Sequence, residues 1–142
     1  MSKLKVTTIA NVADSESTDV TNVINGSAKA WVNFDGTFGS SPFTVANGGI
    51  RAAFNVSSVV DNGTGDYTVN FTTAMPDASY NMVGSSAAGA TANFASNRII
   101  GINADVGGVG SSAPTASACR IASIYGTETK QDAVWIQASF FR

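Results

Sequence analysis

The sequence predicts an all-β fold, an antiparallel β-sandwich of jelly-roll or barrel-like form with an extended N-terminal arm. Apolar and polar residues alternate over short stretches, turn-forming residues separate these stretches, and no stretch keeps a capped helical period. Regularly spaced strands favour an antiparallel sandwich over alternating β-α units. The 142 residues suit one domain. We therefore expect an arm over residues 1–27 and a single β-sandwich domain over 28–142.

The clearest expected element is a β-hairpin with its turn at residues 61–65. Its first strand covers Phe54–Val60, and its second covers Asp66–Thr73, where apolar and polar side chains alternate. Asp, Asn and Gly residues between them supply the turn chemistry. Met75–Ala78 predicts a second turn, because proline fixes its own backbone angle there. Further strands are expected over Lys29–Phe34, Ser79–Ser86, Arg98–Asn103, Ala118–Tyr125 and Val134–Phe141.

The inward faces of these strands predict the hydrophobic core. The set expected to contain most of it is Trp31, Phe54, Val56, Tyr67, Val69, Phe71, Ile121 and Trp135. Cys119 is the single cysteine, so no disulfide can form within the chain. Its apolar neighbours predict a buried, unreactive thiol.

The N-terminal segment Leu4–Asn25 is too thinly apolar for a core strand. Such an arm usually becomes ordered by pairing with a neighbouring molecule, because alone it cannot offset its conformational entropy. Leu4, Val6 and Ile9 are its candidate contact residues. The Ala-, Gly- and Ser-rich segments 84–97 and 104–117 are expected to form loops at one end of the sandwich.

Charge and composition exclude several classes of function. Eight Lys and Arg against ten Asp and Glu give a net charge of −2, without a basic run that could neutralise nucleic acid. The N-terminus lacks the apolar run of a signal peptide, and no stretch approaches the roughly 18 apolar residues of a membrane span. We expect synthesis in a host cytoplasm and no membrane insertion.

No histidine is present, which removes the usual triads and imidazole metal ligands. Asp35, Asp61, Asp66 and Asp77 could form a glycosidase pair, yet each lies beside a turn signal where Asp bonds the backbone. Residues 61–66 resemble a calcium loop but lack its later Glu, so a plain hairpin turn is the favoured interpretation. We expect no enzyme activity and no cofactor.

Aromatic residues offer a possible sugar-stacking platform. The candidates are Trp31, Phe34, Phe38, Phe43, Tyr80 and Tyr125. Trp31 and Phe34 are expected instead in the core or in a subunit interface. Phe38 and Phe43 lie in a Gly- and Ser-rich segment and are the better candidates for exposure.

Three segments carry a resemblance to a known family. Lys29–Thr37, Ile50–Val59 and Asp61–Phe71 resemble, in order and spacing, a domain recurrent in tail-fibre-like virion structural proteins of marine tailed phages. Ala74–Tyr80 continues the similarity, and Leu4–Val6 resembles the short leader of such proteins. The resemblance implies a virion-surface location and a fibre or appendage role, and it supplies no catalytic residues.

One segment departs from the family pattern, an insertion over Phe38–Gly49. The segment is rich in Gly and Ser, which favours mobility, and it is uncharged and partly apolar. Its candidate partner contacts are Phe38, Pro42, Phe43 and Val45. The alternative is that Phe43 and Val45 fold back onto their own sheet.

Two functions follow as expectations. The chain is a short fibre or knob that attaches a phage to a host surface glycan or protein, or it is a capsid decoration protein that stabilises the head without host binding. In either role we expect a symmetric homo-oligomer, a homotrimer, with contacts to other virion proteins through the arm.

Overall fold

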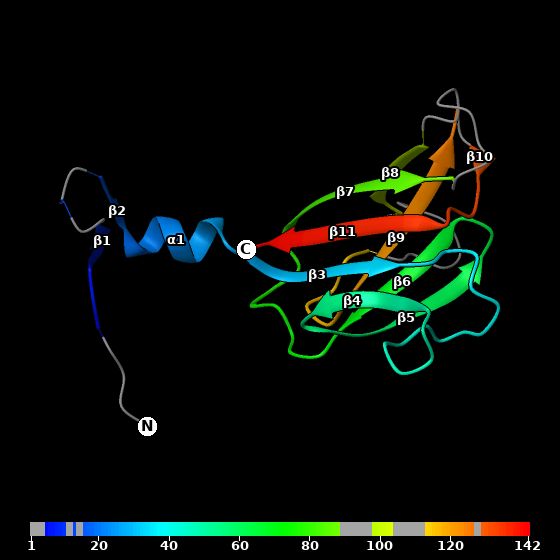
Figure 1. Ribbon diagram of the computed structural model, residues 1–142, viewed down its shortest axis with the longest axis horizontal. Coiled ribbons are helices and arrows are strands. Elements are labelled where there is room, and N and C mark those ends of the chain that lie inside the picture. Colours follow the sequence, from blue (N-terminus) through cyan, green and yellow to red (C-terminus); the bar gives the residue numbers. More distant parts are fainter. Residues whose placement is uncertain (1–4, 11–12, 14–15, 89–97, 104–112, 127–128) are drawn as a thin grey trace.

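The computed structural model describes residues 5–10, 13, 16–88, 98–103, 113–126 and 129–142, and it confirms the all-β fold (Figure 1). Nearly every element is a strand, and every strand pairing is antiparallel. In chain order the elements are β1 (Thr8–Ala10), β2 (Ser17–Asp19), α1 (Val20–Gly26), β3 (Ala28–Phe34), β4 (Ile50–Phe54), β5 (Val56–Gly63), β6 (Asp66–Phe71), β7 (Asn81–Ala87), β8 (Arg98–Ile102), β9 (Ala118–Tyr125), β10 (Thr129–Lys130) and β11 (Trp135–Phe141).

The sandwich is one sheet that curls back on itself into a nearly closed barrel (Figure 1). Its strand order is β4-β3-β11-β7-β8-β9-β6-β5, and β10 pairs with β9. The two end strands, β4 and β5, are joined by Asn55, which has a left-handed backbone with φ 54°. The Asn55 amide donates to the carbonyls of Lys29 and Thr73, both at 3.0 Å, and fixes this corner. Asparagine is among the few residues that adopt this conformation readily.

The strands expected from the sequence are present, with one division. The expected strand over Phe54–Val60 is split by Asn55, so that Phe54 ends β4 and Val56 begins β5. The hairpin between β5 and β6 turns where the sequence predicts, with Asp61 opposite Tyr67. Of the two segments expected as loops, 89–97 and 104–112 lie outside the described residues, while Gly84 lies within β7.

The core contains two groups of packed aromatic rings. Phe34, Phe43 and Tyr67 form one, with the Phe34 and Tyr67 centroids 5.1 Å apart. Phe71, Tyr80 and Phe140 form the other, with centroid separations of 5.0 to 5.8 Å. The second group and the Phe34–Tyr67 pair pack edge to face, which adds to the stabilisation from burial. The other buried side chains include Val32, Ile50, Val59, Val69, Cys119, Ile121 and Ile136.

The predicted core is correct for its central strands and wrong for three aromatic residues. Trp31, Phe54 and Trp135 are 38%, 54% and 45% exposed, respectively. β3 buries the opposite set of side chains, which includes Val32. β11 likewise buries Ile136 and turns Trp135 outward. Both strands carry apolar residues on both faces, so alternation alone does not tell which face is inside.

The sequence predicts an extended arm, but the structure differs: the arm contains the β1-β2 hairpin and the helix α1 (Figure 1). Asp19 caps α1, its carboxylate accepting from the Thr21 amide at 2.7 Å. Val20, Val23 and Ile24 follow at helical spacing, a short signal that the strand-dominated pattern concealed. No α1 side chain is buried, and the arm projects away from the sandwich. The described part of the chain has no helix long and apolar enough to cross a membrane.

Candidate functional site

The loop at residues 38–49, expected to face a partner, instead covers the gap between β4 and β5. Phe43 pairs with Val59 of β5, each amide donating to the other's carbonyl, at 2.7 and 3.0 Å. The Phe43 side chain is fully buried, and its ring lies 6.0 Å from that of Phe34. The exposure and partner contact predicted for Phe43 are therefore wrong, and the fold-back alternative is correct for this residue. Unpaired backbone groups at a sheet edge and a space in the apolar core both favour this placement.

The rest of the loop is held by Asn47. The side-chain oxygen Oδ1 of Asn47 accepts a hydrogen bond from the Thr44 amide at 2.9 Å, and Nδ2 of Asn47 donates to the Pro42 carbonyl at 2.9 Å. Pro42 is exposed and Val45 is 62% exposed, so the fold-back alternative is wrong for Val45. Phe38 is partly buried against the core. Of the predicted contact residues in this loop, Pro42 and Val45 remain accessible to a partner.

The predicted contact residues of the arm are accessible where the structure describes them. Val6 and Ile9 are both exposed, and Ile9 lies in β1 opposite Thr18 of β2. Leu4 lies outside the described residues. The arm therefore offers apolar side chains that the sandwich does not cover.

The outward side of β4, β3, β11 and β7 is a second accessible surface, which the sequence analysis did not predict. We call it the outer sheet face. Strand register places its side chains in two cross-strand rows. One row is Phe54, Trp31, Ser139 and Val83, and the next is Ala52, Asn33, Gln137 and Ser85. One row thus has aromatic residues and the other amides and a hydroxyl.

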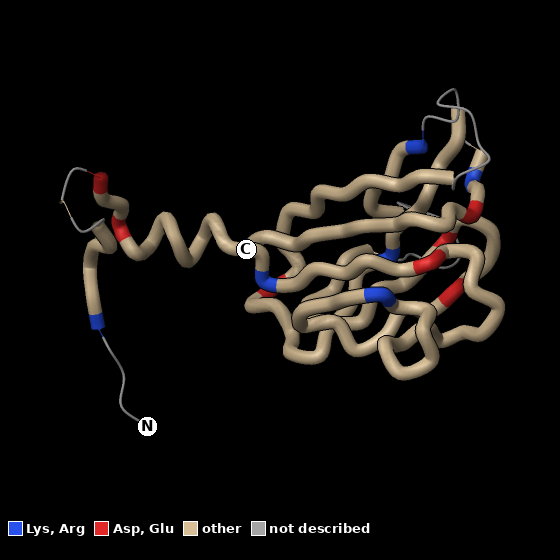
Figure 2. Tube along the Cα trace, in the orientation of Figure 1, with Lys and Arg blue, Asp and Glu red and all other residues tan. Residues whose placement is uncertain are grey.

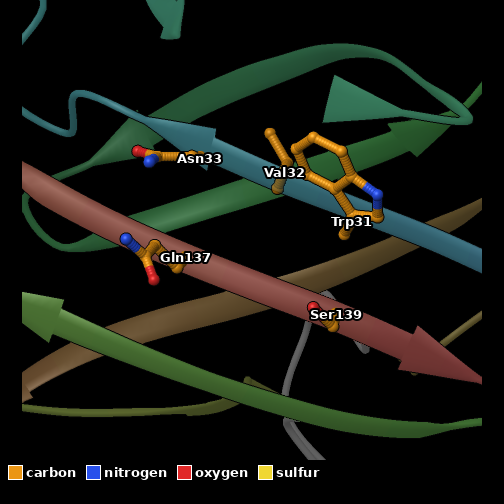
Figure 3. Close-up of a pocket in the computed structure, with 5 residues that line it drawn as sticks. All are labelled: Trp31, Val32, Asn33, Gln137 and Ser139. Atoms are coloured by element: carbon orange, nitrogen blue, oxygen red, sulfur yellow. The ribbon is translucent and has the colours of Figure 1, made fainter. Parts of the chain in front are cut away.

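A shallow pocket of about 220 Å³ opens on this face between β3 and β11 (Figure 3). The figure shows the Asn33 and Gln137 amides beside one another on neighbouring strands, with Trp31 and Ser139 further along. Within the described part of the chain, the shielded Asn33 Oδ1 accepts no hydrogen bond. The pocket combines an aromatic ring, two amides and a hydroxyl, and none of these groups is charged.

Trp135 lies farther along the outer sheet face and is held by a charged pair. The Arg51 guanidinium lies 4.0 Å from the centroid of the Trp135 ring. Arg51 also donates to Asp35 Oδ2 at 3.0 Å. The cation–π contact and the ion pair together fix the orientation of the indole ring. One face of that ring is consequently covered by the protein itself.

Asp66 is the centre of a cluster of polar side chains whose hydrogen bonds stabilise the fold. Its carboxylate, 7% exposed, accepts from Arg120 Nε at 2.6 Å, from Lys130 Nζ and from Asn103 Nδ2 at 2.9 Å. Burial favours the neutral carboxyl, but the hydrogen bonds and charges of Arg120 and Lys130 outweigh it and lower the Asp66 pKa to about 2. These partners occupy the oxygen atoms that a calcium loop at 61–66 would need. No cluster of metal-ligating side chains occurs elsewhere in the described residues.

The other candidate carboxylates bond the backbone two residues on, as their turn signals predict. Asp35, Asp61 and Asp77 each accept from such an amide, at 2.9, 2.8 and 2.8 Å. The buried Cys119 thiol has its pKa raised by desolvation. Tyr67 is likewise buried, and burial together with its hydrogen bond to Asp132 raises the pKa of its hydroxyl. These groups are used for folding, which leaves the outer sheet face and the arm as the candidate functional surfaces.

Comparison with known proteins gives no relative for this chain: no family model, curated protein or solved structure matches it.

Proposed function

We propose that the chain is a bacteriophage virion structural protein, a surface appendage of fibre or knob type that takes part in attachment to the host. Two parts of the molecule carry the proposal: an arm whose helix has no buried residues, and a nearly closed sandwich with exposed aromatic side chains on one face. An isolated helix as short as α1 is marginal in water, so its order needs a neighbouring molecule. The arm is suited to anchoring and the sandwich to presentation.

The resemblance of Lys29–Thr37 and Asp61–Phe71 to tail-fibre-like phage proteins supports a virion-surface location. The exposed aromatic residues of the outer sheet face favour host contact over a purely structural role, because large apolar side chains are rarely left together on a surface without a partner. The alternative, a capsid decoration protein, uses the same arm but needs no such face.

Immunogold electron microscopy of the virus particle that carries the chain tests this proposal. We expect label at the tail or at a projecting appendage, and we expect purified full-length protein to compete with the phage for adsorption to host cells. Label distributed over the head lattice, together with unchanged adsorption, would establish the decoration role instead.

A further inference from the structure

We propose that the outer sheet face is a binding site for a neutral oligosaccharide, which lies along β3 and β11 from Trp31 to Trp135. This inference rests on the proposed attachment role and gives the chemical class of its ligand. Four features of the face support it: the spacing of its aromatic rings, the polar groups between them, its lack of charge and the hydrogen-bonding state of Asn33.

The two tryptophans lie at opposite ends of a strip of the outer sheet face that follows β11. Trp31 is opposite Ser139, four residues along β11 from Trp135. At about 3.4 Å of rise per residue, the indole-bearing positions are roughly 14 Å apart. That span suits an oligosaccharide rather than a single sugar. Aromatic rings can stack on the apolar C–H faces of sugar rings, and Phe54 beside Trp31 extends this surface at one end.

The groups between the tryptophans are polar. Gln137 lies midway between Trp135 and Ser139 on β11, with Asn33 on one side and Ser85 on the other. Amides and hydroxyls both donate and accept hydrogen bonds, as sugar hydroxyls require. A protein–protein interface has the opposite arrangement, with an apolar centre and a polar rim. The pattern therefore favours a glycan over a protein or a second copy of the chain.

The stretch of the face between the two tryptophans is also uncharged. Neither Ala30–Phe34 nor Trp135–Phe141 contains an acidic or basic residue, and Figure 2 shows both strands almost entirely without charge. The nearest charged groups lie at the two ends: Arg51 and Asp35 pair with each other beside Trp135, and Lys29, two residues before Trp31 in β3, donates to the carbonyls of Ile24 and Ser27. Because Arg51 is paired with Asp35 and Lys29 is turned to backbone carbonyls of the arm, the stretch between the tryptophans offers an anionic glycan no cation, and a neutral chain is the matching ligand.

The Asn33 side chain has an unused hydrogen-bond acceptor. Its carbonyl oxygen is shielded and accepts no hydrogen bond from the described residues. A buried acceptor left without a donor is unfavourable, so turning the amide toward a sugar hydroxyl gains a bond without breaking one at that oxygen.

Tryptophan fluorescence tests the proposal directly, because the chain has two tryptophans and both lie on this face. The full-length protein is titrated with chitohexaose, maltohexaose and a soluble mannan as neutral probes, and with heparin as an anionic probe. We expect a saturable blue shift or quench with at least one neutral probe and none with heparin. No saturable change with any neutral probe, or tighter binding of heparin, would overturn the proposal.

Variants locate the site. We expect Trp31→Ala to raise Kd at least about tenfold, since an exposed tryptophan that stacks on a ligand usually carries much of the binding energy. Trp135→Ala should have a smaller effect, because Arg51 already covers one ring face. Gln137→Ala, an exposed polar change that should leave folding intact, is expected to raise Kd roughly fivefold. Tyr125→Ala removes an aromatic side chain of similar exposure on β9 and should leave Kd unchanged.

Other outcomes separate this inference from the attachment role. If Trp31→Ala and Gln137→Ala bind the probe as tightly as the parent chain, the site is elsewhere. If Trp31→Ala instead dissociates an oligomer, the face is a subunit contact and the inference is wrong. If glycan binding fails while purified protein still blocks phage adsorption, the attachment role stands and the ligand class is wrong. Immunogold label on the head would reject the attachment role whatever the titration shows.

Discussion

Phe71 and Phe54 show at the scale of single residues how much a side chain's position decides its contribution. The Phe71 ring is buried against Tyr80 and Phe140, whereas Phe54 is 54% exposed. We expect Phe71→Ala to lower the free energy of unfolding by roughly 3 to 5 kcal/mol through lost burial and a cavity. Phe54→Ala, the matched control, should change it by less than about 1 kcal/mol. Urea denaturation of both variants checks this, and equal losses would contradict the assigned strand faces.

The residues that were misplaced from the sequence have a common physical cause. Alternation predicts correctly that Tyr67, Val69 and Phe71 share a buried face, because Thr68 and Asn70 on the other face are polar. In β3 the residues on either side of Trp31 are apolar as well, so hydrophobicity gives no orientation. In β5, Val56 packs against the core and Val59 is buried, a spacing of three residues that simple alternation does not predict and that the register shift between Val56 and Ser58 allows. The binding face was missed because its aromatic residues were assigned to the core.

At the scale of elements, the loop at 38–49 is part of the barrel, and two of its residues make this testable. Phe43→Ala removes a buried ring and should cost roughly 3 to 5 kcal/mol. Val45→Ser changes an exposed side chain of the same loop and should cost less than about 0.5 kcal/mol. Thermal unfolding of the two variants compares them. If Phe43→Ala lowered the stability only slightly, the loop would not close the gap beside β5.

Deleting the loop, by joining Thr37 to Gly49, would consequently test folding and not recognition. The sequence identified this segment as an insertion, but its composition could not show that Phe43 pairs with β5. That pairing depends on a gap between β4 and β5, which exists only once the whole sheet has curled. The strands themselves were predictable because their alternation and turns are local signals.

At the scale of the whole molecule, the Asp66 cluster joins β6, β9 and β10 and should make stability depend on acid pH. The folded pKa of about 2 lies below the ordinary 3.8, so the cluster stabilises the fold above about pH 4. This contribution, roughly 2 kcal/mol, is lost as pH falls toward 2. Urea denaturation between pH 7 and pH 2 measures it, and Asp66→Asn should flatten the dependence.

A second carboxylate titrates in the same range and needs a control. Hydrogen bonds from Arg142 and from the Ser79 amide lower the Asp77 pKa to about 2 as well. Asp77 is exposed, so salt screens its charge interaction with Arg142, whereas the buried Asp66 cluster is screened much less. The Ser79 hydrogen bond remains in salt, so measurements in high salt and in an Asp77→Asn background isolate Asp66. An acid dependence that Asp66→Asn leaves unchanged in high salt would show that the cluster does not control it.

The arm leads to a prediction about assembly. Val6 and Ile9 are exposed, and no α1 side chain is buried, so the arm has little to hold it in one conformation within a single molecule. We expect the purified chain to form a closed, symmetric homo-oligomer, a trimer, through this arm. Multi-angle light scattering should give a trimer for the full chain and a monomer after deletion of residues 1–25. The sandwich should keep its thermal unfolding transition in the deleted form, because the core lies entirely within β3–β11 and the loops between them. A full chain that is monomeric over the accessible concentration range, with unchanged mass after the deletion, would show that the arm is ordered by another protein or by none.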